Sequence, residues 1–210
     1  MKALIIANGT LPGKNLLRAI ARSSDCIVCA DGGSNHARRL GIKPDIILGD
    51  LDSITPATRR YFRNVEIMHI PDQYSTDLEK AISYCLMRKI TSADIVGATG
   101  TRIDHSTGGL GCFKKFRNKI LLRFIDTVGI VTDIGRKTIL KTKRDEKISL
   151  IPLERCEGIT TTNLQYPLKN EILELGYREG ISNCATASSI TITVKKGTLL
   201  LYRFHDTNKL

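Results

Sequence analysis

The sequence predicts an α/β fold in which an N-terminal doubly wound domain with a mostly parallel sheet precedes a small C-terminal all-β sandwich domain. Over the first 125 residues, short apolar runs alternate with segments of helical periodicity. After residue 126, short runs rich in β-branched residues follow one another between turns. Alternating strands and helices are typical of a parallel sheet, and closely spaced short strands are typical of a sandwich. We therefore expect two domains, at residues 1–130 and 135–210.

The N-terminal elements are predicted from apolar runs and from the residues that end them. Strands are expected at 3–7, 26–30, 46–48, 65–70, 93–98 and 121–125. Helices are expected at 16–23, 34–40, 56–62, 76–88 and 105–116. Helical spacing is clearest at 76–88, where the apolar residues are Leu78, Ala81, Ile82, Cys85 and Leu86. Thr55 is expected to cap the helix at 56–62, and Gly41 to end the helix at 34–40.

The C-terminal elements are predicted from shorter β-rich runs. Strands are expected at 129–132, 138–140, 147–152, 157–162, 173–175, 189–195 and 198–204. From Ser189 to Val194, Ser or Thr alternates with Ile or Val, which indicates a half-buried strand. Leu168 to Asn170 indicates a short helical turn, and Lys196-Gly197 a hairpin turn before the last strand.

The chain is strongly basic, with a formal net charge of +11 at pH 7 over 210 residues. Such a charge suits nucleic acid, an acidic membrane surface or an anionic small substrate. Aromatic residues make up only 5% of the chain, too few for a platform that stacks single-stranded bases. No apolar run is long enough to span a membrane, and the first apolar run is too short for a signal peptide. We therefore expect a cytoplasmic protein that binds neither nucleic acid nor membranes.

The six cysteines are expected to be reduced thiols, as is usual in a cytosolic protein. Cys26 and Cys29 have the spacing of a redox pair, but they fall within a predicted strand, where their side chains face opposite sides of the sheet. The sequence holds no second pair that would complete a zinc site. We expect all six to be small core or surface residues.

Clusters of small polar and acidic residues follow four of the predicted strands. The cluster after the third strand contains Asp50 and Asp52, which point to the same side if the backbone there is extended. Two carboxylates held this close favour a hard cation such as Mg²⁺ that carries substrate phosphates. The alternative is a turn with a helix cap. Because ligands bind beyond the carboxyl ends of strands in open α/β sheets, the four clusters together favour a ligand site.

Two more of these clusters stand at predicted helix starts. Asp31-Gly32-Gly33 ends the second strand, and the helix N-terminus that follows favours an anion. Asp77 begins the long helix and can add a third metal carboxylate, while Gln73 and Thr76 can donate to phosphate oxygens. The alternative for Thr76 and Asp77 is an ordinary helix cap with a favourable acidic residue.

The fourth cluster is a Gly/Thr-rich loop before another helix. Arg102 offers a planar fork of donors that suits phosphate. Asp104 can act as a general base toward a hydroxyl or simply hold Arg102 in place. His105 can carry a proton, although a histidine at a helix start is more often a capping or packing residue.

These clusters belong to an ordered series of motifs. ADGGSN, GDLDS, DQYSTDLEKA and GTRIDH are followed by SLIPL, GITT, YPLKN and GISN. The series resembles the thiamine pyrophosphokinase (thiamine diphosphokinase) family over nearly the whole chain, from Asp31 to Gly197. The resemblance implies a catalytic α/β domain that binds ATP and Mg²⁺, a β-sandwich domain that binds thiamine, and a homodimer. It also implies transfer of the diphosphoryl group of ATP to the hydroxyl of thiamine, which gives thiamine diphosphate and AMP.

Carried over position by position, the family pattern implies three groups of site residues. The metal-binding carboxylates are Asp50, Asp52 and Asp77, which together with Asp104 form the catalytic set. The ATP-binding residues are Asp31, Gly32, Gly33, Gln73, Thr76, Arg102 and Asp104. The thiamine-binding residues are Asn35, Ser182 and Asn183. In this family the thiamine site lies between the catalytic domain of one subunit and the β-domain of the other, so the resemblance implies active sites at the subunit interface.

The sequence departs from the family pattern at three places. Thr101 stands where a glycine usually precedes Arg102, Gly108-Gly109 stands where an asparagine is common, and Cys184 stands where an acidic or otherwise polar residue is frequent. The first two departures affect nucleotide fit, and the third affects thiamine affinity. None of them removes a predicted metal ligand.

Three other functions stay open on the sequence alone. The nearest is a diphosphokinase that acts on a pterin or on a thiamine-like pyrimidine alcohol. A non-catalytic nucleotide-sensing or nucleic-acid-binding module would explain the positive charge, but Asp50, Asp52 and Asp77 would repel phosphates without a metal. A structural β-domain scaffold with a degenerate enzyme half is disfavoured by the intact set of acidic residues.

Overall fold

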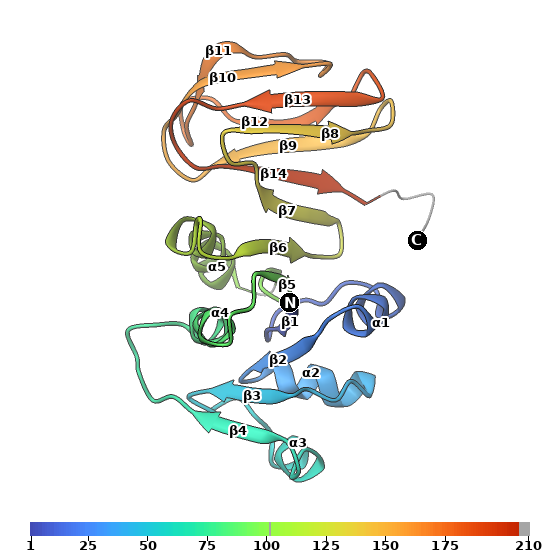
Figure 1. Ribbon diagram of the computed structural model, residues 1–210, viewed down its shortest axis with the longest axis vertical. Coiled ribbons are helices and arrows are strands. Elements are labelled where there is room, and N and C mark those ends of the chain that lie inside the picture. Colours follow the sequence, from blue (N-terminus) through green and yellow to red (C-terminus); the bar gives the residue numbers. More distant parts are fainter. Residues whose placement is uncertain (101, 206–210) are drawn as a thin grey trace. The chain divides into compact units, whose positions relative to one another are not determined.

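The computed structural model describes residues 1–100 and 102–205, and the chain divides into two compact units, Met1–Thr127 and Val128–Leu210. The first unit is α/β with a parallel sheet, and the second is built from antiparallel strands, which confirms the predicted fold class (Figure 1). Among the described residues, no helix is both long enough and apolar enough to cross a membrane.

The N-terminal unit alternates strands and helices along its whole length. Its strands are β1 (Lys2–Ile6), β2 (Cys26–Ala30), β3 (Ile46–Gly49), β4 (Glu66–His69), β5 (Ser92–Val96) and β6 (Leu121–Ile125). Its helices are α1 (Lys14–Arg22), α2 (Gly33–Leu40), α3 (Pro56–Tyr61), α4 (Asp77–Met87) and α5 (Ile103–Lys115). Neighbouring strands pair in parallel in the order β6-β5-β1-β2-β3-β4.

The strand order of the parallel sheet creates a crevice at its carboxyl edge. The chain moves outward from β1 to β4 and then returns to place β5 on the other side of β1. Right-handed crossovers therefore put α1 and α2 on one side of the sheet and α4 and α5 on the other, as Figure 1 shows. The loops that follow β1 and β5 leave in opposite directions, and such switch points are where open α/β sheets bind ligands.

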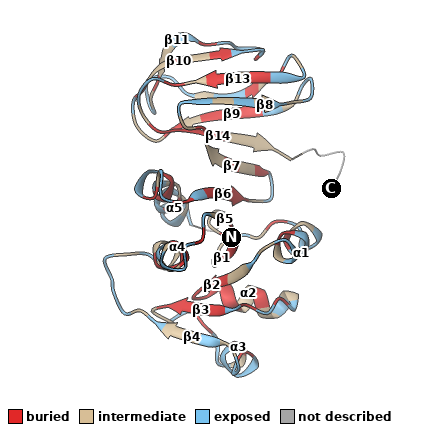
Figure 2. Cartoon of the chain, viewed as in Figure 1, coloured by how far each residue is buried: buried red, intermediate tan, exposed pale blue. Residues whose placement is uncertain are grey.

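The central strands of the parallel sheet are the rigid part of this unit. Leu4 to Ile6 in β1 and Ile46 to Leu48 in β3 are fully buried, and Figure 2 shows the buried residues concentrated along the strands. Helix α4 packs over β1, β2 and β3. Each large apolar side chain removed from water contributes roughly 1.5–3 kcal/mol, so these strands hold the loops at their ends firmly.

The predicted helix caps at Thr55 and Thr76 and the predicted helix stop at Gly41 are confirmed. Thr55 caps α3 by accepting a hydrogen bond from the Thr58 N–H (3.2 Å). Gly41 ends α2 in the left-handed region at φ 66°, which a glycine adopts without strain. Thr76 and Glu79 form a capping box at the start of α4, in which each side chain accepts from the backbone N–H of the other.

The C-terminal unit is a sandwich of two antiparallel sheets. Its strands are β7 (Gly129–Asp133), β8 (Lys137–Lys141), β9 (Lys147–Pro152), β10 (Cys156–Thr162), β11 (Lys169–Leu173), β12 (Gly180–Cys184), β13 (Ser189–Thr193) and β14 (Leu199–Phe204). One sheet has the order β12-β9-β14-β7 and the other β11-β10-β13-β8. Apolar residues from both sheets, such as Ile148 and Ile192, share one core.

Two predictions for the segment of β11 are wrong. Lys169 and Asn170, expected in a helical turn, lie in the strand because the Asn170 N–H donates to the Thr160 hydroxyl of β10 (3.0 Å). The strand expected at 173–175 ends at Leu173. Pairing with β10 therefore overrides the local preference of this segment.

Two further features of the C-terminal unit were not predicted correctly. Strand β12 was missed because Ser182 has a φ of 57° and the register shifts between Gly180 and Asn183, so the sequence lacks regular alternation. The predicted hairpin at Lys196-Gly197 is wrong. Strand β13 pairs with β8 and β10, while β14 pairs with β7 and β9, so the chain crosses between sheets at this turn.

The cysteines are thiols, as expected. Cys26 and Cys29 lie on β2, with Cys29 buried. Burial raises the pKa values of both thiols, which keeps them protonated and unreactive. A redox role for this pair is therefore not favoured.

Candidate active site

A cavity of about 580 Å³ opens at the carboxyl edge of the parallel sheet in the N-terminal unit. Its walls are the loops after β1, β2, β3, β4 and β5, together with the first turns of α4 and α5. Of the predicted site residues in this unit, those that line it are Asp31, Gly32, Asp50, Gln73, Thr76, Asp77, Arg102 and Asp104. Asp52, Gly33 and Asn35 are not among its lining residues.

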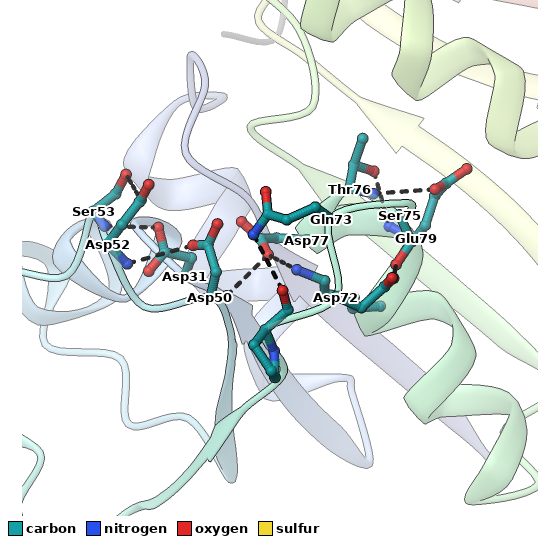
Figure 3. A network of polar contacts seen from close by, with 12 residues as sticks. Asp31, Asp50, Asp52, Ser53, Asp72, Gln73, Ser75, Thr76, Asp77 and Glu79 are labelled. Carbon is teal, nitrogen blue, oxygen red and sulfur yellow. Dashed lines mark hydrogen bonds and ion pairs between the residues drawn. The ribbon is translucent and has the colours of Figure 1, made fainter.

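Three carboxylates meet in the wall of this cavity. Asp31 follows β2, Asp50 follows β3, and Asp77 is the first residue of α4. One carboxylate oxygen from each lies within 4.8 Å of the other two. Figure 3 shows them in one polar network, in which the Asp50 N–H donates to Asp77 Oδ1 (3.3 Å). Lys80, one turn along α4 and almost fully buried, places its ammonium 3.0 Å from the same Asp77 oxygen.

The three carboxylates fit a divalent cation. Asp31 is only 4% exposed, and its Oδ1 is a buried oxygen without a hydrogen-bond partner among the described residues. Burial raises the pKa of Asp31, so the negative charge is costly where it stands. A Cβ at Gly49 would lie 2.9 Å from Asp77 Oδ1, so a side chain there would crowd the carboxylates. Hard oxygen donors with uncompensated charge are the ligands that Mg²⁺ and similar cations prefer.

Asp52 lies outside this group of carboxylates. Strand β3 ends at Gly49, and Leu51 has a φ of 66°, so the extended backbone that would turn Asp50 and Asp52 to one side is absent. The Asp52 side chain is exposed and accepts a hydrogen bond from the Ser53 hydroxyl (2.7 Å), as Figure 3 shows. Its role as a metal ligand stays a prediction.

The loop before α4 forms one side of the cavity. Asp72 accepts hydrogen bonds from the Ser75 hydroxyl and from the Tyr74 N–H (3.1 Å), and these bonds lower its pKa. Gln73 donates to the Pro71 carbonyl (3.2 Å). Figure 3 shows this loop running into Thr76, whose hydroxyl is occupied by the helix cap described above.

Arg102 and Asp104 form a two-point ion pair at the start of α5. Arg102 Nε donates to Asp104 Oδ1 (3.1 Å) and Nη2 to Asp104 Oδ2 (2.5 Å). These bonds lower the pKa of Asp104 to about 2, so its carboxylate is a weak proton acceptor. The geometry favours the interpretation in which Asp104 holds Arg102. The remaining N–H groups of the guanidinium stay available to an anion.

Two glycines stand at the start of α2, and each position requires a glycine for a different structural reason. A Cβ at Gly33 would lie 1.9 Å from the Ile6 carbonyl oxygen, so this glycine lets the helix pack against β1. A Cβ at Gly32 would lie 2.3 Å from Asn8 Nδ2, and both residues line the cavity. Only Gly32 therefore offers its backbone to a ligand in the cavity.

The predicted thiamine residues all make defined local contacts. The Asn35 carboxamide binds the backbone of Ser53 and Thr55. In the C-terminal unit, Asn183 is buried on β12, where its Oδ1 accepts from the Tyr166 N–H (3.1 Å) and its Nδ2 donates to the Tyr166 carbonyl (2.8 Å). Ser182 is exposed, and its N–H donates to the Ser149 hydroxyl (3.0 Å).

Comparison with known proteins places both units in one family. The family model described as the catalytic domain of thiamin pyrophosphokinase matches residues 17–122, and the one described as its vitamin B1 binding domain matches residues 137–199. The thiamine pyrophosphokinase of Bacillus subtilis is 31% identical over 212 residues, covering 96% of this chain and 98% of that protein. The chain belongs to the thiamine pyrophosphokinase family.

Solved structures agree with this assignment. The crystal structure of the Bacillus subtilis thiamine pyrophosphokinase superposes with a TM-score of 0.84 at 27% identity, covering 98% of this chain and 100% of that one. The Candida albicans thiamin pyrophosphokinase, at 18% identity, shares the fold with a TM-score of 0.89, covering 98% of this chain and 89% of that one. The resemblance expected from the motifs is confirmed. The chain is an enzyme of the thiamine diphosphokinase class, which makes thiamine diphosphate, and kinases generally need a divalent metal.

The departures from the thiamine pyrophosphokinase pattern lie in different parts of the structure. Gly108 lines the cavity, and a Cβ there would meet nothing within 4 Å, so this position leaves room in the cavity wall. The Cys184 N–H donates to Asn183 Oδ1 (2.9 Å), so the backbone at this position supports the neighbouring asparagine. Thr101 lies outside the described residues.

The sequence analysis missed several residues that line the cavity. Lys80 lies three residues after Asp77 on the same helix face, a spacing that could have identified it as a partner. Asn8 and Thr99 line the cavity from the ends of β1 and β5, where the strand order reverses. Their positions depend on the sheet order, which periodicity alone does not give.

We expect Asp31→Asn to stabilise the cation-free protein and to weaken its stabilisation by Mg²⁺. The change removes a buried charge that Asp50 and Asp77 repel, and such relief at a functional site is worth about 0.5–2 kcal/mol. The measurement is thermal unfolding in chelator and in excess Mg²⁺. The exposed Glu66→Gln on β4 serves as the control and should behave as wild type in both conditions. A variant that loses stability in chelator and is stabilised by Mg²⁺ as strongly as the wild type would contradict this account of Asp31.

We expect Asp104→Asn to lower kcat/KM without changing the shape of the pH–rate profile. Arg102 lowers the Asp104 pKa to about 2. The ion pair is therefore complete at any pH above the ordinary pKa of an aspartate, and it is lost only as the pH falls through about 2. Asp104 therefore stays ionised from about pH 5 to 8, the range in which histidine side chains change charge, so it should add no limb to the profile there. The measurement compares profiles of the two proteins. Loss of an acidic limb in the variant would instead identify Asp104 as the group that titrates.

Proposed function

We propose that this enzyme transfers the diphosphoryl group of ATP to the hydroxyl of thiamine, giving thiamine diphosphate and AMP. The observation that carries the proposal is the group of Asp31, Asp50 and Asp77 in the wall of one cavity, in a chain of the thiamine pyrophosphokinase family. Several carboxylates in one wall suit a polyphosphate that brings a cation. For AMP to leave, the hydroxyl must attack the β-phosphorus.

We propose Mg²⁺ as the cation, with Asp50, Asp52 and Asp77 as ligands and Asp31 as a further carboxylate beside them. Asp52 lies on the exposed side of the loop that carries Asp50, where it can meet a cation that arrives with ATP. When bound, the cation neutralises phosphate oxygens and the charge that develops on them in the transition state. Oxygen-only donors favour Mg²⁺ over softer metals.

The cationic side chains of the cavity are proposed to complete the ATP site. Arg102, held at two points by Asp104, can present its remaining N–H groups to phosphate oxygens. Lys80 brings a positive charge to the carboxylate group from the buried side and limits its repulsion. Gln73 is an exposed amide in the wall, able to donate to the nucleotide.

The backbone around α2 and α4 contributes further proposed ATP contacts. Gly32 brings the N-terminus of α2 to the cavity, where its N–H groups favour an anion. Gly33 supports this contact by letting the helix lie close to β1. Thr76 holds the first turn of α4 through its cap, and this turn carries Asp77. Positioning and electrostatics of this kind supply most of the rate in phosphoryl transfer.

The C-terminal unit is proposed to bind thiamine and to form a homodimer, with each active site at the subunit interface. The match of residues 137–199 to a vitamin B1 binding domain supports this role. Ser182 and Asn183 are the proposed residues, together with Asn35 of the N-terminal unit. Ile181, next to Ser182, is 64% exposed, so its apolar side chain can contact a ring.

We also propose that the enzyme is cytoplasmic and binds no nucleic acid. Six cysteines kept as thiols suit a reducing compartment. The acidic residues of the cavity repel a nucleic-acid backbone that brings no bound cation.

The test is a product assay with purified protein, Mg²⁺, ATP and thiamine, in which AMP is resolved from ADP. We expect AMP and thiamine diphosphate in equal amounts. Formation of ADP would mean γ-phosphoryl transfer, and turnover only with a pterin or another pyrimidine alcohol would reassign the acceptor. Absence of any acceptor-dependent turnover would favour a nucleotide-binding module without catalysis.

We expect Asp50→Asn, Asp52→Asn and Asp77→Asn each to abolish measurable turnover while the fold is kept. Removing one charge-neutralising ligand should cost several kcal/mol of transition-state stabilisation, about a hundredfold in rate or more. The measurement is kcat at saturating Mg²⁺, with circular dichroism as the check on folding. Near-normal kcat in Asp52→Asn alone would limit the cation site to Asp31, Asp50 and Asp77.

A further inference from the structure

We propose that Asn35 is a positioning residue that holds the acidic loop, defined as residues 50–55, in the shape that brings Asp50 to the other carboxylates. This inference rests on the proposed function and differs from it in one respect. The resemblance to the family assigns Asn35 to thiamine, whereas its contacts assign it to the backbone of the acidic loop.

Both the nitrogen and the oxygen of the Asn35 carboxamide are hydrogen-bonded to the acidic loop. Its Nδ2 donates to the Ser53 carbonyl (2.8 Å), and its Oδ1 accepts from the Thr55 N–H (3.1 Å). The Thr55 hydroxyl lies 3.1 Å from the same oxygen. A planar amide that donates and accepts at two points of one backbone fixes both its distance and its orientation. A ligand that used these groups would have to displace the loop.

The acidic loop is held from a second side by one of the carboxylates. Asp31 Oδ2 accepts from the Ser53 N–H (3.1 Å), and Asp31 stands four residues before Asn35 at the start of α2. The two peptide groups that flank the Ser53 α-carbon are therefore anchored to the same short segment. Because this bond uses Oδ2, it leaves the buried Oδ1 of Asp31 for the carboxylate group.

The shape of the acidic loop needs such anchors. Leu51 is held at a φ of 66°, in the left-handed region that a leucine rarely adopts. Asp50 is held beside two other negative charges. Both features favour a relaxed loop in which Asp50 moves away. The bonds from Asn35 to Ser53 and Thr55 oppose that relaxation, and Thr55 is also the cap that fixes the start of α3.

The positioning role and a thiamine contact predict different kinetic effects. If Asn35 acts through the acidic loop, its loss weakens cation binding and slows the chemical step but leaves thiamine affinity nearly unchanged. If Asn35 touches thiamine, its loss raises the KM for thiamine and leaves the loop as it is.

The first experiment is amide hydrogen exchange in the free protein, without cation or substrates. We expect Asn35→Ala to lower protection of the Thr55 amide by roughly 10- to 100-fold, since several hydrogen bonds to the loop are lost together. In Asn35→Asp an acceptor is kept for the Thr55 N–H while the donor to Ser53 is lost, so protection at Thr55 should largely return. Asn15→Ala, an exposed asparagine on α1, is the control and should exchange as wild type.

The second experiment measures kinetics of the same variants at varied Mg²⁺ and thiamine. For Asn35→Ala we expect kcat to fall and the Mg²⁺ concentration for half-maximal rate to rise, each by about 10- to 100-fold, as for other residues that orient metal ligands. The KM for thiamine should change by less than about twofold. A rise confined to the thiamine KM, with unchanged exchange at Thr55, would overturn the proposal and restore Asn35 as a thiamine contact.

The two experiments separate this inference from the proposed function. Hydrogen exchange requires no turnover, so unchanged protection at Thr55 in Asn35→Ala overturns the positioning role whatever the enzyme transfers. Absence of thiamine diphosphate formation by the wild type, with the expected loss of protection in Asn35→Ala, would overturn the proposed function alone.

Discussion

Mutual repulsion of three carboxylates is the constraint around which the catalytic unit is arranged. Like charges about 4 Å apart repel by roughly 4 kcal/mol near a protein surface, and Asp31, Asp50 and Asp77 offer oxygens within 4.8 Å of one another. The surrounding structure opposes this repulsion with the buried ammonium of Lys80, backbone donors and a helix N-terminus at Asp77. The three carboxylates still carry a net negative charge, so the site favours binding of a cation.

The parallel sheet makes this arrangement possible because it delivers the three carboxylates from separate, rigid elements. Buried strands β2 and β3 end side by side, and α4 packs over both, so its first residue reaches the same edge. A single loop that carried three acidic residues could relax by moving one of them away. Elements fixed by the core of the unit cannot do so without loss of apolar burial.

Local signals predicted the elements and the caps, but the assembly of the site depended on backbone conformations that leave no such signal. Apolar runs indicated the strands of the α/β unit, and the caps at Thr55 and Thr76 followed from their residue types. The place of Asp31 in the carboxylate group, with Asp52 outside it, depends on left-handed conformations at Asp31 and Leu51. Non-glycine residues with positive φ are held by tertiary contacts, which a sequence pattern does not record. The bulge at Ser182 hid β12 for the same reason.

A polar residue inside a functional motif can serve the backbone that supports the ligand. Asn35 and Asn183 both use a carboxamide to bind a neighbouring chain segment at two points, the first at Ser53 and Thr55 and the second at Tyr166. Asparagine suits this task because one planar group replaces a backbone donor and a backbone acceptor together. Gly33 is likewise a motif residue with a structural role, because its lack of a side chain lets the helix pack against the sheet. Motif membership therefore identifies the region of the site, and the hydrogen bonds decide which of its residues are free to meet a substrate.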